Sequence, residues 1–271
     1  MIHKFKRKFD KTLFCYRHSA GLRDFFSIVS NSKKLRWSKK NRTKPQQDKP
    51  VKINFVYNHK KRDLYLRTYE GDFDIFYEVL YHQTYHLEIS NPENIKTIVD
   101  LGANIGLSAI YFLSQFSNAE IICIEPDPGN YILLTKNLTN EISTNRATCI
   151  NAAVASKDGT GSVQIGHFRQ NTKVSNEASQ ENPVLLISLN NLLKQNNIEK
   201  INLLKIDIEG GEEDLFTENT EWLKKTDHII IELHSERIKE KCIAVLVNYN
   251  FTVKNLRGEI YHAMKSSLKK S

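Results

Sequence analysis

Hydrophobic and polar positions follow two alternating periods from residue 51 to the end of the chain. Short apolar runs bounded by polar residues, as at 97–100, 120–125 and 201–207, predict strands. Between them, apolar residues recur every three or four positions, which predicts helices such as 105–116. Short apolar runs that alternate with helices are typical of parallel strands covered on both faces. The pattern therefore predicts an α/β fold with a doubly wound, mostly parallel sheet.

The same pattern predicts the remaining elements along the chain. They are a hairpin (53–57 and 64–68), helices at 72–81, 130–140, 212–223 and 238–248, strands at 148–151 and 228–233, hairpin or loop insertions over 159–187, and an antiparallel C-terminal pair at 251–256 and 259–264.

Positive charge is concentrated at the N-terminus. The chain of 271 residues has a net charge of +8, but residues 1–50 hold 15 Lys or Arg against three Asp, a net charge of +12. The remainder has a net charge of −4. The polar stretch 44–50 contains two prolines and is typical of a linker. We therefore predict a basic, partly helical N-terminal extension over 1–50 and a main domain over 51–271.

The basic segment allows two interpretations. Apolar residues at helical spacing predict a short amphipathic helix, and aromatic residues alternate with the basic ones, so that residues 1–45 could contact a membrane surface or nucleic acid. The alternative is a solvated extension that packs a few aromatic rings onto the main domain, because charge runs alone are weak evidence. The apolar and aromatic positions are Phe5, Phe9, Phe14, Leu22, Phe25, Phe26, Val29 and Trp37.

Composition limits the class of protein and its compartment. With 40% hydrophobic and 26% charged residues, the chain has the balance of a soluble globular protein. It contains no apolar run long enough to span a membrane, and its basic N-terminus lacks the apolar stretch of a secretory signal. The four cysteines lie far apart without a Cys-x-x-Cys pair, which indicates free thiols and a cytoplasmic location.

The loop after the first strand of the predicted sheet suggests a cofactor site. Gly102 allows a sharp turn, and Gly106 allows the next helix to pack closely. Asp100 precedes these glycines, and a carboxylate there suits a cationic ligand better than the pyrophosphate of a dinucleotide. Taken alone, this loop could also be an ordinary tight turn between a strand and a helix.

A second acid sharpens that prediction. Glu125 ends the next strand, where a carboxylate can accept hydrogen bonds from the two hydroxyls of a ribose. An adenosine that carries a cationic amino-acid tail satisfies both acids, which points to S-adenosylmethionine. Asn151 and Ala152 follow the third strand, where they either border the adenine or only pack the strand.

Three blocks of the sequence resemble the signature motifs of the FkbM family of S-adenosylmethionine-dependent methyltransferases. They are Asp100–Ser108, Glu125–Pro128 and Leu204–Glu212, and the similarity spans about residues 60–235. The resemblance implies a Rossmann-like class I methyltransferase fold, seven-stranded with an antiparallel C-terminal strand, and methylation of a hydroxyl on a saccharide or other small natural product. The chain departs from the family at 188–192, where a Thr-Leu-Asp block is usual. The predicted cofactor-binding residues are Asp100, Gly102, Ala103, Asn104, Gly106, Glu125, Pro126, Asp127, Asn151 and Ala152.

Methyl transfer to a hydroxyl requires alignment of the reactants and usually a general base or a metal ion. The predicted catalytic residues are Asp207, Glu209 and His234, which follow the fourth and fifth strands. Each has an alternative role: Asp207 could position the cofactor or acceptor, Glu209 could cap a helix, and His234 could be structural. No group of residues has the spacing of metal ligands, so we predict no metal site.

Two other functions compete with this prediction. A nucleic-acid methyltransferase or binding protein would use the basic N-terminal segment, but the acidic loop 207–212 would repel a phosphate backbone. An NAD-dependent oxidoreductase would share the sheet, but the loop at 100–106 lacks its third glycine position. We therefore expect a small-molecule or saccharide acceptor rather than nucleic acid.

Overall fold

The computed structural model describes residues 2–41, 43, 48–164, 173–175 and 182–266, with side chains from Phe9 onward. The described residues form two compact units, one up to His86 and the other from Leu87 onward. This division differs from the boundary predicted near residue 50, and most of the predicted linker, 44–47, lies outside the described residues.

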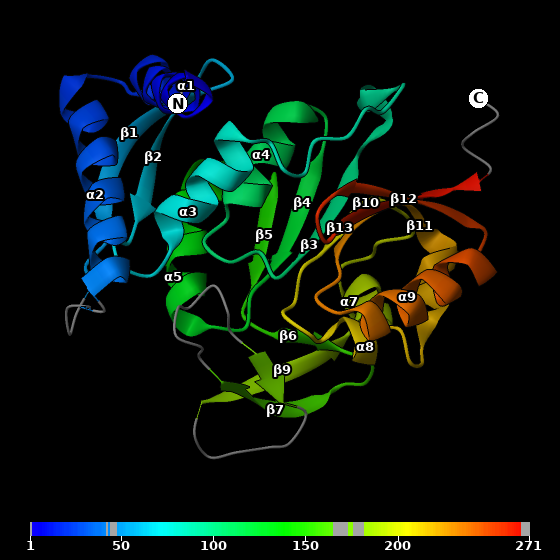
Figure 1. Cartoon of the computed structure of the whole chain (residues 1–271). Helices are drawn as coiled ribbons and strands as arrows, with labels where there is room; N and C mark the ends of the chain where they lie inside the picture. The colour runs from blue at the N-terminus through cyan, green and yellow to red at the C-terminus, as the bar shows by residue number, and fades with distance from the viewer. Residues whose placement is uncertain (1, 42, 44–47, 165–172, 176–181, 267–271) are drawn as a thin grey trace. The chain divides into compact units, whose positions relative to one another are not determined.

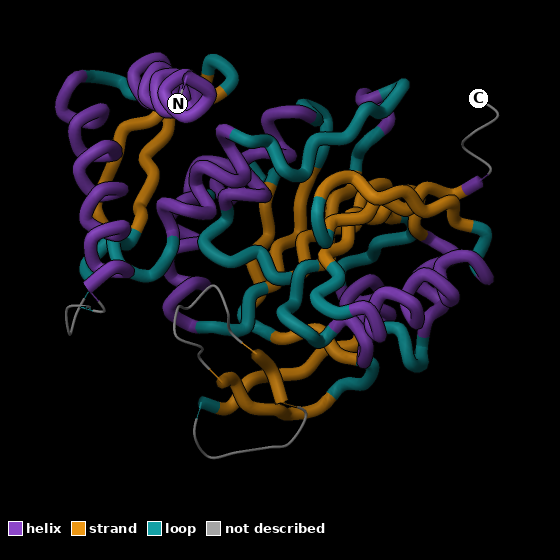
Figure 2. Tube along the Cα trace, viewed as in Figure 1, coloured by secondary structure: helices purple, strands orange, loops and turns teal. Residues whose placement is uncertain are grey.

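The described part of the N-terminal unit consists of two long helices, a hairpin and two short helical segments that follow each other (Figures 1 and 2). The hairpin is antiparallel, and side chains of alternating positions on both strands are buried, which is the period of a strand with one covered face. The long helix α2 buries Ile28 and Leu35 on one side. The elements are α1 (Ile2–His18), α2 (Leu22–Asn41), β1 (Val51–Tyr57), β2 (Lys60–Leu66), α3 (Asp72–Phe76) and the π-helix η1 (Tyr77–Tyr81).

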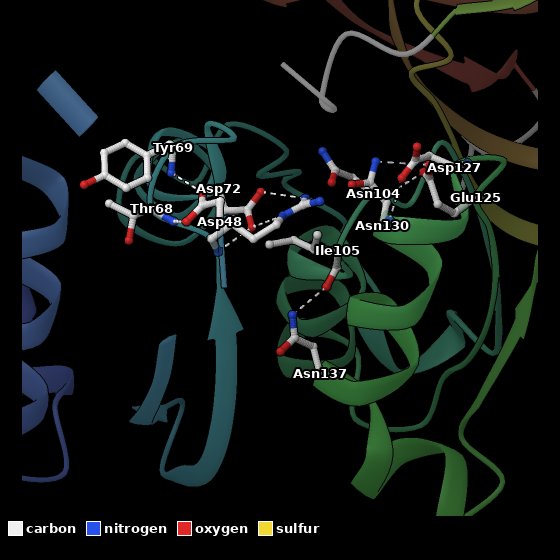
Figure 3. Close-up of polar contacts among 11 residues, drawn as sticks. Asp48, Thr68, Tyr69, Asp72, Asn104, Ile105, Glu125, Asp127, Asn130 and Asn137 are labelled. Atoms are coloured by element: carbon white, nitrogen blue, oxygen red, sulfur yellow. Dashed lines mark hydrogen bonds and ion pairs between the residues drawn. The ribbon is translucent and has the colours of Figure 1, made fainter. Parts of the chain in front are cut away.

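Hydrogen bonds explain why the unit includes residues on both sides of position 50. Asp24 of α2 accepts hydrogen bonds from the backbone N–H and the side chain of Asn54 in β1, at 2.8 and 3.2 Å. Asp48 accepts backbone N–H groups of Thr68 and Tyr69, just after β2 (Figure 3). The helices therefore pack against the hairpin, and the predicted helix around residues 22–29 is confirmed as part of a longer one.

The C-terminal unit is built on a seven-stranded sheet with the order β12-β13-β11-β10-β3-β4-β5. The five strands from β11 to β5 pair in parallel, whereas β13 is antiparallel to both of its neighbours. The predicted doubly wound sheet with an antiparallel C-terminal strand is confirmed. The strands are β3 (Thr97–Leu101), β4 (Glu120–Ile124), β5 (Ala147–Ile150), β10 (Ile201–Ile206), β11 (Thr226–Glu232), β12 (Phe251–Arg257) and β13 (Ile260–Lys265).

Helices connect these strands and bury their apolar sides against the sheet. Leu192, Trp222 and Leu246 come from three of them and share one apolar core with strand residues such as Val99 and Ile231. The single helix predicted over 212–223 is wrong: a four-residue helix and a 3-10 helix occupy that stretch. The helices are η2 (Pro92–Asn94), α4 (Leu107–Gln115), α5 (Pro128–Asn137), α6 (Thr139–Ser143), α7 (Leu189–Gln195), α8 (Glu212–Leu215), η4 (Thr220–Lys225) and α9 (Glu236–Asn248).

A small second sheet follows β5. It has the order β6-β9-β7-β8 and its own apolar core. The insertions predicted over 159–187 thus form strands, while residues 165–172 and 176–181 lie outside the described part. The strands are β6 (Ala153–Ala155), β7 (Gly159–Gln164), β8 (Lys173–Ser175) and β9 (Pro183–Ser188).

Candidate active site

The carboxylate of Asp100 lies at the end of β3 and is completely buried. Lys205 of β10 places its Nζ 3.2 Å from Oδ1 of Asp100, and the Ser108 hydroxyl donates to Oδ2 at 2.5 Å. A cation of the chain itself therefore balances the acid for which the sequence suggested a cationic ligand.

Lys205 is the functional residue that the sequence analysis missed at this position. It is 2% exposed, and its ammonium also donates to the carbonyl oxygens of Leu101 and Gly102, at 3.3 and 2.7 Å. Burial alone would lower the pKa of Lys205, but the carboxylates of Asp100 and Asp207 raise it above its ordinary value. Lys205 is therefore a cation at neutral pH, and a lysine within the apolar run 201–206 is the sequence signal that could have identified it.

Gly102 and Gly106 have positive φ angles of 73° and 88° in the loop after β3. A Cβ atom on Gly102 would lie 1.8 Å from the backbone oxygen of Asp207, so only glycine lets the ends of β3 and β10 approach this closely. A Cβ atom on Gly106 would lie 2.9 Å from a methyl carbon of Leu134 in α5. Chain packing thus accounts for both glycines, as predicted for Gly106.

Glu125 follows β4 directly and holds the neighbouring loop by three hydrogen bonds. Its Oε2 accepts the backbone N–H of Asn104 at 2.8 Å, and its Oε1 accepts the backbone N–H of Asp127 at 3.0 Å and the Asn130 side chain at 3.2 Å (Figure 3). Burial raises the pKa of Glu125 to about 7 although these donors oppose the shift. The carboxyl group is therefore positioned by the protein and is partly protonated at neutral pH.

The surroundings of Glu125 fit the nucleoside part of S-adenosylmethionine. Oδ1 of Asn104 is a buried acceptor without a hydrogen-bond partner among the described residues, and Asn104 adopts a left-handed conformation with φ of 49°. A buried acceptor of this kind is costly unless a donor reaches it. Ribose hydroxyls are such donors, so Asn104 and Glu125 are the residues that would hold the cofactor's ribose.

Of the other predicted cofactor residues, some form hydrogen bonds within the loops and others are buried in the apolar interior. Asn151 donates to the carbonyl oxygens of Glu125 and Pro126, at 2.8 and 3.2 Å, and so joins the ends of β4 and β5. Asp127 is buried, and its carboxylate accepts the backbone N–H of Asn130 at the start of α5, as a helix N-cap does. Ala103 and Ala152 are buried in the apolar interior, at 1% and 0% exposure.

The three predicted catalytic residues come together at the ends of β10 and β11. Asp207, Glu209 and His234 each offer one ligand atom, and these atoms lie within 4.8 Å of one another. Glu209 and Gly210 both have positive φ angles, which turn the loop sharply beside Asp207. His234 places its Nε2 3.7 Å from Oδ1 of Asp207 and 3.6 Å from Oε1 of Glu212.

Glu212 is a second residue that sequence reasoning missed. It is completely buried and accepts backbone N–H groups of Ile208 and Gly210 at 3.0 and 2.9 Å, which fixes the loop. Its position at the start of a helix is the signal that could have found it. Asp207, followed by Glu212 and Glu209, raises the pKa of His234 to about 9, so the imidazole is mostly protonated at neutral pH.

Asp207, Glu209 and His234 could also hold a divalent metal ion, and Glu232, His234 and Glu259 form a second such group around the same histidine. The sequence spacing did not reveal them because the ligands follow different strands. A metal ion would have to displace the proton of His234 and tolerate the Lys205 ammonium 3.5 Å from Asp207. The existing charges therefore compete with a metal ion at this position.

Comparisons of the sequence with known proteins identify methyltransferases. A family model described as "Methyltransferase FkbM domain" matches residues 100–265. "Methyltransferase sdnD" from Sordaria araneosa is 23% identical over 208 residues, which cover 64% of this chain and 80% of that protein. "Hexuronic acid methyltransferase AglP" from Haloferax volcanii is 26% identical over 151 residues, which cover 55% of this chain and 60% of that protein. The crystal structure of Aeropyrum pernix fibrillarin with S-adenosylmethionine has a TM-score of 0.43 at 14% identity, covering 81% of this chain and 85% of that one.

Proposed function

Because the chain belongs to the FkbM methyltransferase family, whose model matches more than half of its residues, we propose that it methylates a hydroxyl group on a saccharide or another small natural product. S-adenosylmethionine is the cofactor, and when bound it supplies an electrophilic methyl group on a sulfonium. The printed name of one relative, a hexuronic acid methyltransferase, supports a saccharide acceptor.

The convergence of Asp207, Glu209 and His234 carries this proposal. The carboxyl ends of parallel strands meet at one edge of a sheet, so these side chains and the cofactor residues Asn104 and Glu125 share that edge. A hydroxyl group is a weak nucleophile, and a base that removes its proton during attack accelerates the reaction. The site therefore combines a nucleoside-binding end with a proton-accepting end.

His234 is the proposed general base. Its Nε2 is buried and faces the carboxylates of Asp207 and Glu212, which leaves Nδ1 to accept the proton of the acceptor hydroxyl. The two carboxylates orient the ring and stabilise the imidazolium that forms, as the acid of a catalytic triad does. Only the neutral imidazole accepts a proton, so the pKa of about 9 predicts activity that rises with pH up to that value.

The experiment offers the protein S-adenosylmethionine with a panel of glucuronic acid, galacturonic acid and neutral monosaccharides. Addition of one methyl group is followed by mass spectrometry, and resistance of the product to mild alkali distinguishes an ether from a methyl ester. We expect His234→Gln to lower kcat/KM by about 10²- to 10⁴-fold while the affinity for S-adenosylhomocysteine, measured by calorimetry, stays unchanged. Glu125→Ala should instead weaken that affinity by roughly 10- to 100-fold, the effect of losing a charged hydrogen bond.

Glu236→Gln is the matched control, because this side chain lies at the start of α9, two residues after His234, and is 71% exposed. It should change neither kinetics nor binding. Absence of S-adenosylhomocysteine binding, full activity of His234→Gln, or methylation of RNA in place of every saccharide would each refute the proposal.

A further inference from the structure

Large apolar side chains gather on the outer surface of α1 and α2. Tyr16, Leu22 and Phe26 are 58%, 63% and 63% exposed. Phe25 joins them into one surface, because its ring centroid lies 5.8 Å from that of Tyr16 and 5.2 Å from that of Phe26. We call these four residues the aromatic patch. Exposed apolar surface of this kind marks a contact with a partner or a membrane.

Trp37 extends the aromatic patch along α2. It follows Phe26 by 11 residues, about three helical turns, and therefore lies on the same side of the helix. Its side chain is 62% exposed, whereas Ile28 and Leu35 on the other side of α2 are buried. The helix thus has one side that packs within its own unit and one side that does not.

Basic residues surround the apolar ones on these two helices. Arg17 lies beside Tyr16, Arg23 beside Leu22, and Lys33 between Phe26 and Trp37, and all three are exposed. The one acid of α2, Asp24, bonds to Asn54 of the hairpin and therefore lies on the side of α2 that packs within the unit. Further exposed basic residues of α2 are Lys34, Arg36 and Lys40, whereas Lys39 forms an ion pair with Asp74 of the same unit.

We propose that the aromatic patch, Trp37 and the basic residues around them bind the surface of a bilayer that contains anionic phospholipids. A helix with aromatic and basic side chains on one side lies in the plane of the interface, with apolar groups among the acyl chains and cations near the phosphates. A nucleic acid would pair with the basic groups, but it would leave most of the aromatic patch, Leu22 included, without an apolar partner. None of the described helices is long and apolar enough to cross a bilayer.

The test is cosedimentation of the full-length protein with phosphatidylcholine vesicles, with and without phosphatidylserine. The wild type should bind vesicles with phosphatidylserine and lose binding as salt increases. The double variant Phe26→Ser/Trp37→Ser should bind at least about tenfold more weakly, because two large side chains no longer leave water. Arg23→Gln/Lys33→Gln should lower binding by roughly 10-fold or more, through loss of two cations near the anionic surface.

Ile132→Ser is the matched control, since Ile132 is also 63% exposed but lies on α5 of the other unit. It should leave vesicle binding unchanged, and circular dichroism should show the same folded state for every variant. The proposal is overturned if Phe26→Ser/Trp37→Ser binds vesicles as the wild type does. Two further results would overturn it. The first is that the wild type forms an oligomer in the absence of lipid and Phe26→Ser/Trp37→Ser does not. The second is that the wild type binds a nucleic-acid homopolymer, the double variant does not, and neither of them binds vesicles.

Discussion

Charged residues at the strand ends of the C-terminal unit and on α2 of the N-terminal unit have opposite surroundings. At the strand ends of the C-terminal unit, Lys205 is 2% exposed and Asp100 is completely buried, and each is the partner of the other. On α2 of the N-terminal unit, Arg23 and Lys33 are exposed beside apolar side chains. The net charge of +8 describes neither region. The buried charges position the loops of the candidate site, whereas the exposed charges are available to a partner.

This difference predicts where a lost charge destabilises the fold. Removal of one partner from a buried ion pair leaves an uncompensated charge, which costs about 3–5 kcal/mol. Removal of one partner from an exposed pair costs at most about 1 kcal/mol. The same substitution should therefore lower the free energy of unfolding much more in a buried ion pair than in an exposed one.

The largest effect is expected for Lys205→Met, which leaves Asp100 buried without its cation. We expect the free energy of unfolding to fall by about 3–5 kcal/mol. Lys200→Met is the control, because Lys200 is 59% exposed although its Nζ lies 2.8 Å from Asp227, and it should cost less than about 1 kcal/mol. Urea unfolding in a Trp37→Phe background measures both, since the remaining Trp222 is buried in the C-terminal unit.

A second substitution tests the cause of that loss. Asp100→Asn/Lys205→Met removes both charges, so it should be more stable than Lys205→Met alone. Equal losses for Lys205→Met and Lys200→Met would contradict the distinction between buried and exposed pairs. If the double variant loses as much stability as Lys205→Met, then Lys205 stabilises the fold through packing and not through its charge.

A smaller effect separates two glycines of the same site. Gly102→Ala adds a Cβ atom 1.8 Å from the backbone of Asp207 and imposes a left-handed conformation on alanine, so it should cost roughly 2–5 kcal/mol. Gly210 also has a positive φ, but a Cβ atom there would meet nothing within 4 Å, so Gly210→Ala should cost only about 1–2 kcal/mol. Thermal unfolding compares the two variants. Equal losses of stability would mean that the close approach of Gly102 to the backbone of Asp207 is unimportant.

The sequence predicted the main sheet because its strands are apolar runs bounded by polar residues. The boundary predicted near residue 50 differs from the division of the compact units after His86, because charge and prolines mark a change of composition and say nothing about packing. The hydrogen bonds from Asp24 to Asn54 join residues far apart in the chain, and no local pattern encodes them. The helix predicted over 212–223 failed for a related reason, since Glu212 bonds back to the preceding loop and the helix ends at Leu215.

The candidate site was predictable to the extent that it follows from strand ends. Asp207 and His234 end two neighbouring parallel strands, and that topology alone brings them together. The partners of those residues were not predictable, because Lys205 lies inside a buried strand and Glu212 acts through backbone groups of a loop. A periodic pattern shows which residues are buried but not which buried charges pair with each other.

The smallest of the expected effects concerns His234. Its side chain is 23% exposed, between the buried charges of Asp100 and Lys205 and the exposed charges of α2. Its pKa is raised to about 9 in the folded protein, above an ordinary value of 6.5. A raised histidine pKa contributes stability that is complete below about pH 6.5 and is lost as the pH rises to about 9. The contribution should be on the order of 1–2 kcal/mol, because a partly exposed group is screened by solvent.

The measurement is urea unfolding of the wild type and His234→Gln at several pH values between 6 and 9.5. Other titrating groups are common to both proteins, so the difference between their free energies of unfolding isolates His234. That difference should shrink steadily over the interval. A difference that does not depend on pH would mean that His234 has the same pKa in the folded and the unfolded protein, and the rise of activity toward pH 9 should then be absent as well. With His234 as the proposed base, stability and activity should depend on the same proton in opposite directions, because the charge that attracts His234 to Asp207 and Glu212 is the charge that it must lose before it can accept a proton.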